Sequence, residues 1–80
     1  MCNKITLQIP NTEIYLTPGC LVKLGRFDND RWYVKYGWYA WGGNRAVCGW
    51  YLEDKHDSTL IKPLQITDLD DIYILERVNY

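Results

Sequence analysis

Residues 31–52 read RWYVKYGWYAWGGNRAVCGWYL. Aromatic and β-branched residues favour strands on both sides of Gly42-Gly43-Asn44, and this triplet is typical of a hairpin turn because asparagine tolerates a left-handed backbone. A three-residue loop makes the numbers of paired residues sum to 86, so that Tyr36 faces Trp50. Every even-numbered pair is then apolar, whereas a two-residue loop would pair inward with outward side chains. The sequence therefore predicts a hairpin whose even-numbered side chains are buried.

The turn signal Asp28-Asn29-Asp30 predicts a further strand before this hairpin. The same reasoning makes paired numbers sum to 58 and places Leu24 opposite Val34. The two turns together predict a three-stranded meander with one apolar face, on which Trp38 and Trp50 are buried. This inner face is expected to contain Cys20, Val22, Leu24, Val34, Tyr36, Trp38, Ala40, Ala46, Cys48, Trp50 and Leu52.

The rest of the chain predicts short strands separated by turns. Strands are expected at Met1–Ile9, Glu13–Thr17, Thr59–Lys62 and Ile72–Glu76, with one helical turn at Thr67–Asp71 capped by Thr67 or Asp68. The predicted fold class is mainly β. We expect residues 1–80 to form one domain, a closed or half-open barrel of five or six strands with the helical turn before the last strand.

Composition narrows the class of protein. The chain has 80 residues and a formal net charge of -1, which disfavours a protein that binds the phosphates of duplex nucleic acid.

The register places Cys20 and Cys48 about 9.6 Å apart, two strand spacings and beyond the roughly 7 Å limit for a disulfide. Three widely spaced cysteines and one histidine give no zinc framework. With no apolar run of about 18 residues and no signal-like segment, we expect a soluble, cytoplasmic protein.

This layout resembles the SH3-like small barrels at the level of the fold, without their peptide-groove residues. A local stretch is also similar to WYL domains, in Gly49-Trp50-Tyr51-Leu52 followed by a polar loop and Leu60-Ile61-Lys62-Pro63-Leu64. Those domains are small barrels that bind ligands or nucleic acid in bacterial regulators. The basic residues usual after the polar loop are absent here, so ligand binding is not carried over.

Catalytic and metal-binding patterns are weak. His56 and Ser58 lie in one polar loop, where adjacent residues rarely hold a catalytic geometry. Asp68, Asp70 and Asp71 lack the spacing of a calcium loop, and no phosphate-binding glycine motif occurs. We therefore predict no enzyme, no metal site and no cofactor.

The odd-numbered face of the meander is unusually aromatic for a solvated sheet. It contains Leu21, Lys23, Tyr33, Lys35, Gly37, Tyr39, Trp41, Arg45, Val47, Gly49 and Tyr51. We predict a partner-binding site at Tyr33, Lys35, Tyr39, Trp41, Arg45 and Tyr51. Gly37 opposite Gly49 leaves bare backbone inside this site. The alternative is that these glycines let the sheet coil and the aromatic rings pack within the domain.

Two functions follow from this face. The first is a non-catalytic module that binds another protein, and the small single-domain chain resembles accessory proteins of phages and mobile elements, including inhibitors of host defence systems. The second is a module for single-stranded nucleic acid or a nucleotide, with stacked bases and with Lys23, Lys35 and Arg45 on phosphate. The net charge favours the protein partner.

Overall fold

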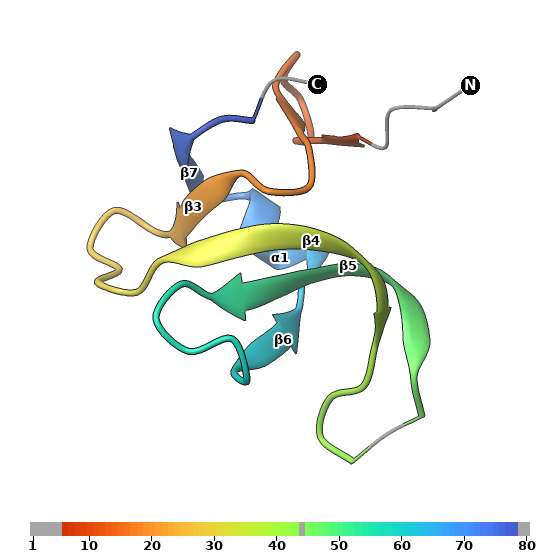
Figure 1. The fold of residues 1–80 in the computed structure, drawn as a ribbon. Coiled ribbons are helices and arrows are strands. Elements are labelled where there is room, and N and C mark those ends of the chain that lie inside the picture. The colour runs from red at the N-terminus through yellow and green to blue at the C-terminus, as the bar shows by residue number, and fades with distance from the viewer. Residues whose placement is uncertain (1–5, 44, 79–80) are drawn as a thin grey trace.

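The computed structural model describes residues 6–43 and 45–78, which form a mainly β structure (Figure 1). The elements are β1 (Leu7–Gln8), β2 (Tyr15–Leu16), β3 (Leu21–Leu24), β4 (Trp32–Tyr39), β5 (Val47–Asp54), β6 (Ile61–Pro63), α1 (Ile66–Leu69) and β7 (Ile72–Glu76). Five strands form an antiparallel sheet in the order β6-β5-β4-β3-β7, and β1 pairs with β2 separately. The predicted fold class is confirmed in its mainly β character and in the helical turn before the last strand.

The predicted register of the central hairpin is confirmed. All eight pairs between β4 and β5 have residue numbers that sum to 86, from Trp32 with Asp54 to Tyr39 with Val47. The strands end there, so Trp41 and Arg45 lie beyond the ladder rather than inside it. The conformation predicted for Asn44 lies outside the described residues.

The predicted register between β3 and β4 is wrong. Leu21 pairs with Tyr33, and Val22 pairs with Trp32, so the numbers sum to 54 and not 58. The reason is a longer loop, organised by the carboxylate of Asp28, which accepts the backbone N–H of Leu24 at 3.0 Å and that of Asp30 at 2.9 Å. Because the shift is even, even-numbered residues still share one face, but β3 lies closer to the start of β4.

This shift exposes side chains that were expected in the core. The last backbone bonds from β4 towards β3 are those of Val34, with Cys20 at 2.9 Å and Gly19 at 2.7 Å. Trp38 is 73% exposed, Tyr36, Ala40, Ala46 and Cys48 are also exposed, and Trp50 and Leu24 are half-buried. The predicted burial of Trp38 and Cys48 is therefore wrong, because no strand in the described part of the chain covers the even face at that end of the hairpin.

The core occupies the other end of the even face. Val22, Val34 and Leu52 are fully buried, together with Cys20. Leu16 of β2, Ile9 and Leu69 of α1 complete the cluster. Segments from both ends of the described chain thus cover the sheet.

The helical turn begins one residue earlier than predicted. Its N-cap is Gln65, not Thr67 or Asp68, and the carboxylate of Asp68 accepts the backbone N–H of Gln65 at 3.0 Å. This contact starts the turn that leads Leu69 into the core. The described residues contain no helix long and apolar enough to cross a membrane.

We expect Leu52→Ala and Trp38→Ala to have very different effects on stability. Leu52 is fully buried, so its truncation should cost roughly 2 to 5 kcal/mol of unfolding free energy. Truncation of Trp38, which is 73% exposed, should cost about 0.5 kcal/mol or less. Urea unfolding measures both values. Equal costs would contradict the observed offset between β3 and β4.

Asp28 should make a pH-dependent contribution to stability. Its partial burial, the largest single influence, acts to raise the pKa of its carboxyl, but hydrogen bonds from Leu24 and Asp30 and the charges of Lys62 and Arg31 lower the pKa overall. A lowered folded-state pKa stabilises the fold above the unfolded value of about 3.9. This contribution disappears as the pH falls through the folded-state pKa.

We therefore expect Asp28→Asn to cost about 1 to 2 kcal/mol at pH 7, because one backbone donor loses its charged acceptor. The difference from wild type should shrink as the pH falls below about 4. Unfolding midpoints across pH 2 to 7 measure this, with Asp30→Asn in the same loop as the matched control. A pH-independent cost would contradict the assigned role of the Asp28 charge.

Candidate functional site

The ends of β4 and β5 extend beyond their neighbouring strands. On one side, β3 pairs with β4 only at residues 32–33, and on the other, β6 pairs with β5 only at residues 51–53. Figure 1 shows this part of the hairpin bending away from β3 and β7. We call residues 35–50, apart from residue 44, the β4–β5 arm. Its side chains contribute none of the fully buried core residues.

The odd face of the arm, together with the adjoining Tyr51, carries most of the predicted site. The rings of Tyr39 and Tyr51 lie with their centroids 4.9 Å apart at an interplanar angle of 34°. Both are half-buried, whereas Trp41 is 48% exposed and Arg45 is exposed. Tyr39, Trp41 and Arg45 line a hollow of about 140 Å³ together with Val47 and Pro63. The structure therefore brings four predicted residues into one neighbourhood.

The other two predicted residues lie at the base of the arm. The Lys35 ammonium lies 5.9 Å from the centroid of the Tyr33 ring, and neither residue lines the hollow. Leu21, expected on the outward face, is instead buried. Pro63 was not among the predicted site residues. Its pairing with Tyr51 places it beside the aromatic residues and follows from the position of β6.

The size and chemistry of this hollow suit a single side chain. Small-molecule pockets usually measure about 300 to 1,000 Å³, well above the 140 Å³ observed here. Four apolar or aromatic side chains and the Arg45 guanidinium line the hollow, and they match an apolar group next to a hydrogen-bond acceptor or carboxylate. No acidic residue is among its lining side chains in the described part of the chain.

A pair of glycines lies across the two strands of the arm. Gly37 faces Gly49, and a Cβ atom placed on either would meet no heavy atom within 4 Å. Gly37 has a φ of 157°, which gives a backbone reason for glycine. Gly49 has neither a positive φ nor a crowded surrounding. Packing within the described residues does not require glycine at position 49.

The even face of the arm is exposed and aromatic too. The Tyr36 ring meets the Trp50 ring edge-on, with centroids 5.2 Å apart and planes at 65°. A hydrogen bond with the Cys48 thiol raises the pKa of the Tyr36 hydroxyl. These residues were predicted to lie in the core because the predicted strand before the hairpin paired along the whole of β4.

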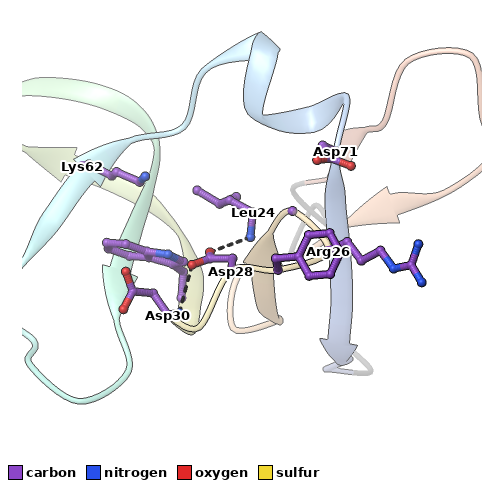
Figure 2. A pocket seen from close by; sticks show the side chains of 9 residues that line it. Leu24, Arg26, Asp28, Asp30, Lys62 and Asp71 are labelled. Atoms are coloured by element: carbon purple, nitrogen blue, oxygen red, sulfur yellow. Dashed lines mark hydrogen bonds between the residues drawn. The ribbon is translucent and has the colours of Figure 1, made fainter.

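A second hollow of about 490 Å³ lies beside the β3–β4 loop (Figure 2). Figure 2 shows Asp28 bonded to Leu24 and Asp30, so this carboxylate already has backbone partners. The Lys62 ammonium lies 4.7 Å from the centroid of the Trp32 ring, which leaves that ring face occupied. These contacts hold the loop and β6 in place. Among residues 6–43 and 45–78, no cluster of His, Cys, Asp or Glu has the grouping needed for a metal ion.

Hydrogen bonds from within residues 54–59 also hold the loop that contains the chain's one histidine and one serine. Asp54 accepts the backbone N–H groups of His56 at 2.8 Å and Asp57 at 3.1 Å. Thr59 donates from its backbone N–H and its hydroxyl to Asp57. These hydrogen bonds shape a turn.

Comparisons of the chain with protein-family models, with curated proteins and with solved structures found no match. The site is therefore interpreted from its own residues.

The two described cysteines should differ sharply in reactivity. Both are free thiols, but Cys20 is 1% exposed and Cys48 is exposed on the arm. Burial, the largest influence on Cys20, acts to raise the pKa, yet hydrogen bonds with Thr17 and Val78 and the charge of Arg77 lower the pKa overall. Solvent access determines the rate of alkylation, because a reagent cannot reach the buried Cys20 sulfur.

We expect iodoacetamide to modify Cys48 rapidly in the native protein and Cys20 only after unfolding. Peptide mass spectrometry over a time course measures both sites, and the same reaction in denaturant is the control in which both react. Equal native rates would contradict the burial of Cys20.

Proposed function

We propose that this protein is a non-catalytic protein-interaction module that binds its partner through the odd face of the β4–β5 arm. The observation that carries the proposal is the hollow formed by Tyr39, Trp41, Arg45, Val47 and Pro63 beside the bare Gly37–Gly49 pair. None of these residues belongs to the buried core cluster of the described chain. Glycine in a strand is a common place for another chain to approach closely.

The residue types support a protein partner. Tyrosine, tryptophan and arginine dominate interface hot spots, and here one of each lines the same hollow. The Tyr39 and Tyr51 rings support each other, so they present a preformed surface. A preformed aromatic surface loses little conformational entropy on binding.

The positions of the cations support a protein over a nucleic acid. Lys23 lies 5.3 Å from the Tyr73 ring centroid and donates to the Arg26 carbonyl oxygen, away from the arm. Lys35 lies over Tyr33 at the base of the arm. Arg45 is then the cation left beside the hollow, which is a weak basis for phosphate binding.

We also propose a fold family, a cellular compartment and a class of partner for this protein. The five-stranded antiparallel sheet with a helical turn before its last strand supports an SH3-like small barrel, a fold widely used for interactions. The free thiols support a reducing cytoplasm. The aromatic arm fits an accessory protein of a phage or mobile element whose partner is a host protein such as a defence component.

We expect the double substitution Trp41→Ala with Arg45→Ala to weaken partner binding at least tenfold, about 1.4 kcal/mol. The thermal midpoint should stay nearly unchanged, because both side chains are exposed and outside the core. The measurement is affinity capture from the source cells after nuclease treatment, with captured polypeptides identified and titrated against each immobilised variant. Phe27→Ala, which removes an 86% exposed ring away from the arm, is the matched control.

Gly49→Ala sharpens this test. An added methyl group meets nothing within the chain, and alanine lowers the entropic cost of ordering the strand, so stability should be equal or slightly higher. Binding should still fall, because the methyl group occupies the space above the bare backbone. Normal binding by both arm variants would refute the proposed surface. Capture that disappears with nuclease and falls steeply with salt would favour the nucleic-acid alternative.

A further inference from the structure

Within residues 6–43 and 45–78, one edge of the arm has backbone groups with no strand partner. The N–H and C=O of Val34 bond to Cys20 and Gly19, just before β3. Backbone groups alternate in direction along a strand, so those of Tyr36 and Trp38 point to the same side as those of Val34. The pairing with β3 has ended there, and no described residue forms a strand against this edge.

This edge lacks the usual protection against strand pairing. Exposed edges in soluble proteins are normally short, or carry prolines, bulges or charges that prevent association. Residues 36–41 read YGWYAW, with no proline and no charge. The ladder with β5 keeps this segment regular as far as Tyr39. A regular, uncharged, aromatic edge is suited to accept another strand.

We propose that two copies of this chain associate by antiparallel pairing of β4 with β4 across this edge, about a two-fold axis at Gly37. The outward-pointing groups of Tyr36 then meet those of Trp38 of the second copy, which allows four backbone hydrogen bonds by symmetry. Gly37 faces itself at the axis. This central position is a non-hydrogen-bonded pair, where side chains come closest, and glycine has none to clash.

The side chains in this register are compatible. Tyr36 and Trp38 of the second copy lie on the same face, as a cross-strand aromatic pair. Lys35 lies opposite Tyr39 of the second copy, so the register opposes no like charges. The chain's net charge of -1 adds little repulsion between copies. These features fit a second copy as the partner, because the same residues of β4 pair with each other across the two-fold axis.

The contact area is small, so the association should be weak. Two strands of about five residues bury less than the roughly 1,200 to 2,000 Å² of stable interfaces. We expect a dissociation constant on the order of 10 to 100 μM, within the range of transient complexes. The pairing uses the backbone groups of Tyr36 and Trp38 and needs no partner on the odd face, so the inference does not rest on the proposed function.

The first test uses the purified protein alone. Sedimentation equilibrium from about 5 to 500 μM should show a monomer–dimer equilibrium, given the expected weak affinity. Hydrogen exchange followed by NMR should show the amides of Gly37 and Tyr39, which face β5, protected at every concentration. The amides of Tyr36 and Trp38 should gain protection only as dimer forms. A chain that stays monomeric throughout, or a dimer that leaves these two amides unprotected, would overturn the proposal.

Matched variants separate the backbone from the ring. Trp38→Pro removes an edge N–H, and proline is tolerated where that N–H faces outward. Trp38→Thr removes the same ring but keeps the donor and a strand-forming side chain. We expect proline to lower the dimerisation constant at least tenfold relative to threonine, about 1.4 kcal/mol. Equal constants in these two variants would contradict strand pairing.

Two further variants keep the result interpretable. Where the proline variant fails to fold, as judged by its unfolding curve, Tyr36→Lys replaces it, because an edge lysine blocks pairing without removing a backbone donor. Gly49→Ala on the other strand should leave dimerisation unchanged while it weakens partner binding. A dimer that persists in Tyr36→Lys, or is lost in Gly49→Ala, would contradict the assigned edge.

Discussion

The Asp28 carboxylate determines where β3 meets β4. By accepting the N–H groups of Leu24 and Asp30, it holds a loop that shifts β3 by four residues from the position expected for a tight turn. Gly25, with a φ of 124°, supplies the left-handed backbone at the start of this loop. Because β3 covers only the first part of β4, the core forms there and the remainder of the hairpin is left as an arm. Core and arm are both consequences of that one offset.

The sequence predicted the hairpin correctly because its information is local. The three-residue loop expected at Gly42-Gly43-Asn44 gives the pair sum of 86 that is found from Trp32 to Tyr39, and the alternation of apolar residues sets the parity of the pairs. The same alternation could not predict the offset of β3, because sums of 58 and 54 place the same residues on the same face. The offset follows hydrogen bonds that backbone N–H groups donate to the Asp28 carboxylate, and such bonds leave no signature in a hydrophobic pattern.

The candidate site was predictable to a similar extent. Tyr39, Trp41, Arg45 and Tyr51 stand out as aromatic or basic residues on one face of a local hairpin. Pro63 and the exposure of Trp38 depend on which strands lie beside that hairpin, and this requires contacts between distant segments. That Ile9, Leu16 and Leu69 join the meander residues in one core was not predicted, for the same reason. Local pairing is encoded in a few residues, while coverage of a face depends on the complete topology.

The pairing of β3 with β7 has a consequence for the order of folding. Leu24 lies opposite Ile72, so this ladder joins segments from near the two ends of the described chain. Contacts of such high sequence separation form slowly, because a long loop must close before they contribute. The β4–β5 hairpin joins neighbouring residues, so it forms before the β3–β7 ladder closes, with the aromatic residues of both its faces uncovered. The folding chain therefore passes through a stage in which its most adhesive segment is formed and its core is not.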